Sequence, residues 1–133
     1  MIIRRFMGTG QKLAKSLPLK PCETSSNIPS SIWTKVGVNL HQQQNHPLNI
    51  LSKIIRKHFE GYQIFDSLSP IVSTKQNFDD LLFSKDHSGR ARTDTYYMDQ
   101  DSVLRTHTSA HQSDIFKNGC DSAVIIADVY RRY

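Results

Sequence analysis

One long amphipathic helix followed by short strand candidates constrains the fold of this chain more than any other feature. The segment NHPLNILSKIIRKHFEGY, residues 45–62, carries large apolar residues at three- and four-residue steps. Asn45 or His46 suits the N-cap, Pro47 suits the first turn and Gly61 suits the end, so we expect a helix over about 47–59. Its expected apolar face consists of Leu48, Leu51, Ile54, Ile55 and Phe59, with Lys53, Arg56 and Lys57 toward water.

The remaining elements are short and alternate between strand and helix patterns. YQIFDSLSPIVS predicts one strand and a bend at Pro70, and NFDDLLF predicts a short helix with Asn77 as N-cap. DTYYMD and SVLRTHT flank a turn at residues 99–101, which predicts a hairpin. SDIFKNG predicts a helix that ends at Gly119, and SAVIIADVY predicts a buried strand. The sequence therefore predicts an α+β fold, an antiparallel sheet flanked by helices.

The excess of basic over acidic residues is confined to the first twenty residues of the chain. Five of the 17 Lys and Arg lie in residues 1–20, which contain no acidic residue, and the other 12 are balanced by 12 Asp and Glu. This leader resembles a mitochondrial transit peptide, with a disordered basic tail as the alternative. LPLKPCETSSNIPSS follows as a linker, so we expect a transit peptide and linker over residues 1–31 and the folded domain over 32–133. A basic RNA-binding module is disfavoured, because the rest of the chain carries no net charge.

Metal and membrane signals are weak. Cys22 and Cys120 form no CxxC pair, which fits a reducing compartment. His107 and His111 have the i, i+4 spacing of a metal pair on one helix, but no third ligand accompanies them, so no protein-bound metal is predicted. No apolar run reaches the roughly 18 residues that a membrane-spanning helix needs.

The stretch LRTHTSAHQ, residues 104–112, gathers an unusual number of polar groups. Alternation along a strand would place Arg105, His107 and Ser109 on one face. Ser109 to Gln112 matches the S-x-x-Q capping box of a helix N-terminus. One interpretation is a polar outer face that leads into a capped helix. The other is a cleft in which these side chains and the helix N-terminus orient a small polar ligand.

Four motifs in the same order and spacing resemble the phenylalanine–tRNA ligases, especially their monomeric mitochondrial form. These motifs are NFDDLL, DTYY, LRTHTSAHQ and DVYRR, and VGVNLHQQQNHPL at 36–48 resembles the segment before the first catalytic-domain helix. The resemblance covers roughly residues 35–132. It implies a class II aminoacyl-tRNA synthetase fold. The sequence departs from the family at DHSGR, where Ser88 replaces a proline and Gly89 is added, and at Ala127, where a glycine is usual.

The resemblance also implies a reaction, its substrates and its site. Phenylalanine and ATP, with Mg²⁺ expected, would form an adenylate, and the acyl group would pass to tRNA-Phe in the mitochondrial matrix. The implied catalytic residue is Arg131, which matches the arginine of the family's motif 2. The implied residues for binding phenylalanine and ATP are His107, Ser109, Ala110, His111, Gln112 and Arg131. A monomer is expected for the full-length family.

The final apolar strand candidate runs into YRRY, where the sequence stops. A strand with nothing after it to pair is an exposed edge, so we expect a catalytic domain cut off in mid-sheet within motif 2. The tRNA-binding regions would then lie outside this chain, and the chain alone would be inactive. The alternative function is a catalytically inactive short isoform or fragment that acts, if at all, as a binding remnant.

Overall fold

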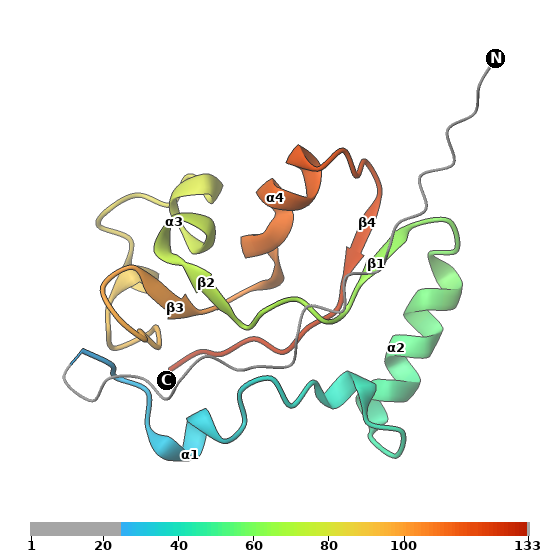
Figure 1. Ribbon diagram of the computed structural model, residues 1–133, viewed down its shortest axis with the longest axis horizontal. Helices are drawn as coiled ribbons and strands as arrows, with labels where there is room; N and C mark the ends of the chain where they lie inside the picture. The colour runs from blue at the N-terminus through green and yellow to red at the C-terminus, as the bar shows by residue number, and fades with distance from the viewer. Residues whose placement is uncertain (1–24, 133) are drawn as a thin grey trace.

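The structure, a computed structural model, describes residues 25–132, so residues 1–24 of the expected transit peptide and linker (1–31) lie outside the described residues. Two small sheets form the body, and helices lie around them (Figure 1). The helices are α1 (Ser30–Trp33), α2 (Pro47–His58), α3 (Thr74–Asn77) and α4 (Gln112–Lys117). The strands are β1 (Gln63–Phe65), β2 (Ile71–Ser73), β3 (Ser102–Leu104) and β4 (Ala123–Ile125). Short 3-10 turns are η1 (Leu40–Gln42), η2 (Asp79–Leu81), η3 (Ser88–Arg90) and η4 (Thr108–His111).

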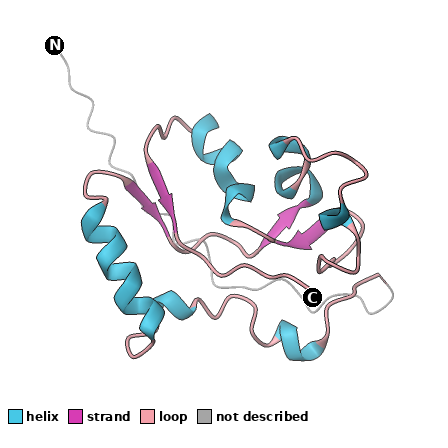
Figure 2. Cartoon of the chain, turned by 180° about the vertical axis from the view of Figure 1, so that it is seen from behind, coloured by secondary structure: helices cyan, strands magenta, loops and turns pink. Residues whose placement is uncertain are grey.

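The two sheets differ in direction, which corrects the expectation of one antiparallel sheet. β2 and β3 pair antiparallel, with Ile71 opposite Leu104. β1 and β4 pair parallel, with Gln63 opposite Ala123. Figure 2 shows the two pairs as separate sheets joined by extended chain. The expected hairpin forms in reduced form, because Tyr97 makes only an isolated antiparallel bridge to Val103. Parallel pairing requires a long connection, and here α3, β3 and α4 all lie between β1 and β4.

Helix α2 has the predicted bounds, but its apolar face is exposed. His46 caps it, since its Nδ1 accepts from the Leu48 N–H at 3.2 Å, and Gly61 follows its end with a φ of 95°. Ser52, which is 4% exposed, is the buried residue of the helix, whereas Ile54 is 61% exposed. The predicted orientation is therefore wrong within the described residues. Polar groups hold the inward side: Asn49 donates to the His41 carbonyl, and Arg56 donates to Ser52 and pairs with Asp66.

The core lies on both sides of the β2–β3 pair. Leu104 is fully buried and packs with Val36, Tyr96 and Tyr130. On the other side Val103, Val72 and Ala110 form a second cluster. Strand alternation explains this division, because Val103 and Leu104 are neighbours in β3 and point to opposite faces. Val36 and Tyr130, which are distant in sequence, thus help to cover one face of the sheet, while Ala110 from the turn after β3 covers the other.

The folded part begins before the expected boundary near Ile32. The Asn27 side chain donates to the carbonyls of Arg92 at 2.8 Å and Thr95 at 3.0 Å. Its Oδ1 accepts from the Tyr97 N–H at 2.6 Å, and its own N–H donates to the Tyr97 carbonyl at 3.1 Å. The last residues of the expected linker therefore bind the body of the domain.

A capping box exists, but at a different S-x-x-Q match from the one predicted. The Ser73 hydroxyl accepts from the Gln76 N–H at 3.1 Å, and the Gln76 Oε1 accepts from the Ser73 N–H at 2.9 Å. Asn77 is thus the last residue of α3 and no N-cap. Ser109 lies inside η4, whose preceding residue His107 makes no side-chain cap bond.

We expect Ser73→Ala to lower the free energy of unfolding by about 1 kcal/mol, because the Gln76 N–H in the first turn of α3 loses its acceptor. Ser109→Ala is the matched control and should change stability by less than about 0.5 kcal/mol, because Ser109 caps nothing. Urea unfolding of both variants measures the difference. Equal losses in the two variants would show that the box at Ser73 contributes no stability.

Candidate functional site

The segment that follows β3 is anchored on one side by buried polar contacts. The Thr106 N–H donates to Asn77 Oδ1 at 3.1 Å, and Asn77 Nδ2 donates to the Thr106 hydroxyl at 3.0 Å. Asn77 is fully buried, so these bonds are shielded from competing water. The Thr106 carbonyl accepts from Arg131 Nε at 3.0 Å. The start of the THTSAHQ segment is thereby tied both to α3 and to the C-terminal part of the described chain.

Arg105 lies inside the domain, which corrects the predicted strand face. The strand ends at Leu104, so the alternation that would place Arg105 beside His107 and Ser109 does not continue. Arg105 is 1% exposed, and its guanidinium donates to the carbonyls of Asp128 at 2.7 Å, Leu68 at 3.0 Å and Ser69 at 3.1 Å. Burial lowers the pKa of this guanidinium, and the nearby Tyr130 and Asp128 oppose that effect. Arg105 therefore connects residues 68–69 with Asp128 through buried hydrogen bonds.

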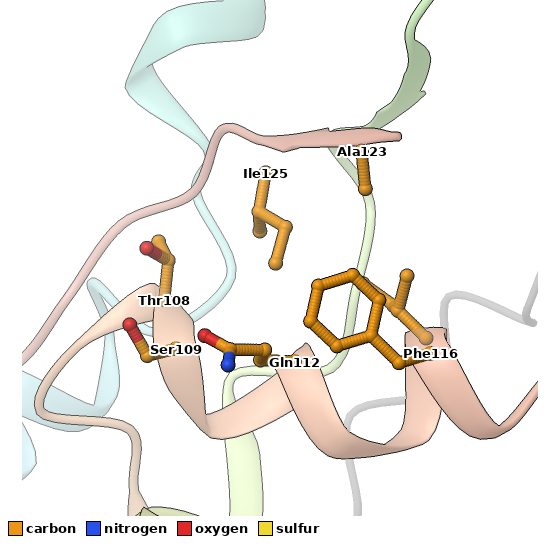
Figure 3. A pocket seen from close by; sticks show the side chains of 7 residues that line it. Thr108, Ser109, Gln112, Phe116, Ala123 and Ile125 are labelled. Atoms are coloured by element: carbon orange, nitrogen blue, oxygen red, sulfur yellow. The ribbon is translucent and has the colours of Figure 1, made fainter. Parts of the chain in front are cut away.

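Ser109 and Gln112 line one cavity, the Ser109 cavity, of about 190 Å³. Figure 3 shows their polar groups at one end and the Phe116 ring with the Ile125 side chain at the other. Gln112 and Phe116 are four residues apart on α4 and share a face, and the other wall comes from β4. The remaining lining residues are Thr108, Ile115 and Ala123. A cavity with one polar end and one apolar wall suits a small amphiphilic ligand.

His107 and Arg131 line a second cavity, the His107 cavity, of about 210 Å³. Four of the predicted site residues thus line two different cavities: Ser109 and Gln112 line the first, and His107 and Arg131 line the second. Burial lowers the pKa of His107, the Asn77 backbone opposes this effect, and the charge of Arg131 lowers the pKa further, so the neutral imidazole is favoured near pH 7. The other lining residues are Phe78, Phe83, His87, Ser88, Gly89, Asp94, Thr95 and Thr106.

Ala110 and His111 line neither cavity, although both were expected to bind substrate. Ala110 is 1% exposed and packs in the cluster with Val72 and Val103. His111 is 8% exposed, and its Nε2 lies 3.2 Å from Arg105 Nη1. Burial and the charge of Arg105 lower the pKa of His111 to about 4. The structure gives these two residues a packing role.

Sequence reasoning missed most of the cavity walls. Phe116 could have been found from its spacing to Gln112, and Ala123 and Ile125 from their shared strand face. Phe83 offers no such signal, because it follows the end of η2 in irregular chain. Its place beside His107 depends on contacts between segments more than 20 residues apart.

Residues 25–132 contain neither a cluster of metal-binding side chains nor a membrane-spanning helix. Within that range no three His, Cys, Asp or Glu side chains gather closely enough to hold a metal ion. The i, i+4 pair of His107 and His111 does not share one helix, because His107 precedes η4. None of the described helices has the length and apolar character that crossing a bilayer requires.

The THTSAHQ segment contributes to the walls of both cavities. Residues 33–133 match the family described as the tRNA synthetases class II core domain (F), and the chain belongs to this family. The resemblance noted from the motifs is thereby confirmed.

Individual proteins similar to this chain are named as phenylalanine–tRNA ligases. The chain is 41% identical to the chloroplastic/mitochondrial phenylalanine–tRNA ligase of Arabidopsis thaliana, over 92% of this chain and 30% of that protein. It is 48% identical to the mitochondrial phenylalanine–tRNA ligase of Dictyostelium discoideum, over 81% of this chain and 26% of that protein. The mitochondrial enzyme of Rattus norvegicus is 38% identical, over 84% of this chain and 26% of that protein. The chain thus spans about a quarter to a third of the length of these relatives.

Proposed function

We propose that the chain supplies the amino-acid-binding part of a phenylalanine–tRNA ligase that acts in the mitochondrial matrix. The observation that carries this proposal is the Ser109 cavity, in which two neutral polar side chains face an apolar wall that includes an aromatic ring. Phenylalanine has the matching form, with a charged backbone end and an apolar side chain. The names of the relatives support the ligase and do not favour the inactive alternative.

Ser109 and Gln112 have the chemistry to receive the ammonium group of phenylalanine. The hydroxyl and the amide oxygen accept hydrogen bonds without carrying charge, and α4 places Gln112 one turn before Phe116. The aromatic side chain would then lie toward Phe116 and Ile125. Burial of its ring against these residues supplies most of the affinity, while the polar contacts fix its direction.

Activation needs positioning and charge neutralisation more than covalent catalysis. The phenylalanine carboxylate oxygen attacks the α-phosphorus of ATP, the bond to the β-phosphate oxygen breaks, and pyrophosphate leaves. Arg131 would stabilise the charge on the α-phosphate oxygens through its planar fork, and His107 would orient the carboxylate. The Arg131 contact to Thr106 supports this role, because it anchors the guanidinium to the residue next to His107.

ATP, Mg²⁺ and tRNA-Phe are the expected partners of the whole protein, which we propose to be a monomer. The described residues do not fit a fixed metal site, since they contain no cluster of three potential ligands. No step is therefore assigned to a protein-held metal. Transfer of the acyl group to tRNA-Phe would follow, with release of AMP from the adenylate.

Ligand-induced stabilisation tests the amino-acid cavity directly. We expect phenylalanine at about 100 times its Kd to stabilise the 133-residue chain by roughly 2.7 kcal/mol, measured as a rise in Tm. Gln112→Ala should abolish most of this rise, because the ammonium loses one of its two acceptors. Ser113→Ala is the matched control on the same helix, since Ser113 lines neither cavity.

Two results would contradict the proposal. The first is an unchanged Tm of the wild-type chain with phenylalanine. The second is an equal rise in wild type and in Gln112→Ala, which would place the ligand elsewhere. Pyrophosphate exchange into ATP, dependent on phenylalanine, tests the activation step in a preparation of the whole ligase, because the 133-residue chain alone is expected to be inactive.

A further inference from the structure

His107 has two buried ring nitrogens without a hydrogen-bond partner. Within the described range 25–132 neither Nδ1 nor Nε2 makes a hydrogen bond of ordinary geometry, although the Asn77 backbone lies close enough to raise the pKa of the ring. A neutral imidazole offers one donor and one acceptor, and leaving both unmatched away from water is unfavourable. Such a group in a native structure calls for a functional explanation. The imidazole therefore keeps hydrogen-bonding capacity that the residues of the described range use only weakly.

Aromatic packing, rather than hydrogen bonding, fixes the position of the imidazole. The Phe83 ring stacks on His107 with a centroid distance of 5.8 Å and an interplanar angle of 7°. Phe83 in turn makes edge contacts with Phe78 at 6.0 Å and His87 at 4.7 Å. Phe78 is 2% exposed, so this group is attached to the core. A ring held between several neighbours has little rotational freedom, and it limits the rotation of the ring stacked on it.

The other groups around the His107 cavity favour an anionic ligand atom. Arg131 supplies a permanent cation, whereas the hydroxyls of Thr95 and Thr106 are already bonded to the Gly89 carbonyl and to Asn77. His87 lies at the cavity and contacts Phe83 on its edge. Asp94 is the acidic residue of the lining and faces the same space. A carboxylate of the substrate would find Arg131 and a neutral imidazole donor together there.

We propose that Phe83 is a positioning residue, which holds His107 by ring stacking so that the N–H of its neutral imidazole can donate to the carboxylate of the bound amino acid. This inference deepens the proposed function and rests on it for the identity of the ligand. Phe83 itself touches the imidazole and no reacting atom. Its removal should change the orientation and environment of His107 without changing the chemical groups that contact substrate.

Nitrogen NMR of the histidine rings tests the positioning directly. In the wild-type chain we expect His107 to titrate below its ordinary pKa, with one dominant tautomer, because the stack keeps the ring from water. Phe83→Leu keeps apolar volume but removes the stack, so the pKa should rise toward 6.5 and the ring signals should broaden. Phe59→Leu is the matched control, since Phe59 makes an edge contact with His58 on the exposed face of α2.

A pair of ligands separates positioning from general damage to the fold. Phenylalanine carries a carboxylate, and phenethylamine has the same ring and ammonium without it. Phe83→Leu should weaken phenylalanine binding about tenfold, which corresponds to the loss of one hydrogen bond to a charged group, and should leave phenethylamine binding unchanged. Phenylalanine should also shift the His107 nitrogen signals in wild type, whereas phenethylamine should not.

The outcomes distinguish this inference from the proposed function. An unchanged His107 titration and spectrum in Phe83→Leu would overturn the positioning role, even if phenylalanine binds. Equal weakening of both ligands would overturn it as well, because it would indicate loss of structure. Failure of wild type to bind either ligand would overturn the proposed function, while an altered His107 spectrum in Phe83→Leu would still support the stack as the element that orients the ring.

Discussion

Replacement of Arg105 by methionine is expected to lower the free energy of unfolding by roughly 3–5 kcal/mol. The guanidinium is the donor to three carbonyls that come from two distant segments, residues 68–69 and Asp128. Methionine fills the apolar part of the space but leaves these buried acceptors unmatched, at about 1–3 kcal/mol each. Arg105→Lys should recover only part of the loss, because a single ammonium cannot reproduce the planar fork. Urea unfolding midpoints measure all three proteins.

Arg132→Met is the matched control for this prediction. Arg132 is exposed and donates to the Arg92 carbonyl at 2.9 Å, so its loss should cost less than about 0.5 kcal/mol. A loss under 1 kcal/mol in Arg105→Met would contradict the role of Arg105, since it would mean that water replaces the guanidinium. A loss of this predicted size is a large part of the 5–15 kcal/mol that stabilises typical domains. The variant should therefore be measured at low temperature.

The sequence predicted elements whose ends are marked by local chemistry. Helix α2 starts at Pro47 after the His46 cap, and α4 ends two residues before Gly119, which has a φ of 80°. Cap and stop residues act through the nearest backbone groups, so they can be recognised without knowledge of the fold. The turn at residues 99–101 is also determined by local contacts, because Asp99 Oδ1 accepts hydrogen bonds from the two N–H groups of residues 101 and 102.

Features that depend on distant partners could not be predicted in this way. The periodicity of α2 separates an apolar side from a polar side, but it does not say which side meets the body. Here Ser52 is buried and Ile54 exposed because hydrogen bonds of Asn49 and Arg56 face inward. Parallel pairing of β1 with β4 likewise joins strands some sixty residues apart, with Gln63 opposite Ala123. Nothing in either strand alone specifies that partner.

The capping box illustrates why a correct motif can be assigned to the wrong place. S-x-x-Q occurs at residues 73–76 and again at 109–112, and both precede a helix. Only Ser73 has the extended backbone of an N-cap, with ψ at 155°, whereas Ser109 already lies within η4. The packing of β3 and the following turn decides between the two, and that packing is tertiary.

The candidate site was predicted in part. The resemblance named six residues, of which His107, Ser109, Gln112 and Arg131 line the two cavities and Ala110 and His111 do not, and their roles toward substrate stay predictions. The alternation argument failed at Arg105, because β3 ends one residue earlier and the chain turns inward. A cation among polar neighbours in sequence resembles a cleft residue, and only the three-dimensional contacts show that carbonyls surround it.

Acid should destabilise the domain through His111 well before its carboxylates protonate. The folded-state pKa of His111 is lowered from 6.5 to about 4, first by burial and second by the charge of Arg105. Between these two pH values the unfolded chain binds a proton that the folded chain does not, so stability falls as pH falls. The slope is about 1.4 kcal/mol per pH unit, and the total loss is about 3 kcal/mol. Above pH 6.5 this contribution is fully present.

His111→Gln isolates the effect, because glutamine keeps hydrogen-bonding groups and does not titrate. The variant should lose less stability than wild type between pH 7 and pH 4.5, measured by urea unfolding at each pH. The lowered pKa of His107 acts in the same direction in both proteins and cancels in the difference. The negative charge of Asp79 is lost only at more acid pH, because Lys85 and Arg90 lower the pKa of its carboxyl from 3.8. Parallel pH profiles of wild type and His111→Gln would contradict the assignment.

The contact between His111 and Arg105 adds a quantitative check on the causes of this shift. If burial is the larger cause, His111 should keep most of its acid sensitivity when Arg105 is replaced by methionine, because the ring stays buried. The part due to the guanidinium charge, 3.2 Å away, should disappear and raise the pKa of His111 partway toward 6.5. Histidine NMR titration of this variant should therefore give an intermediate value. A full return to 6.5 would instead mean that the charge dominates or that the ring has become exposed.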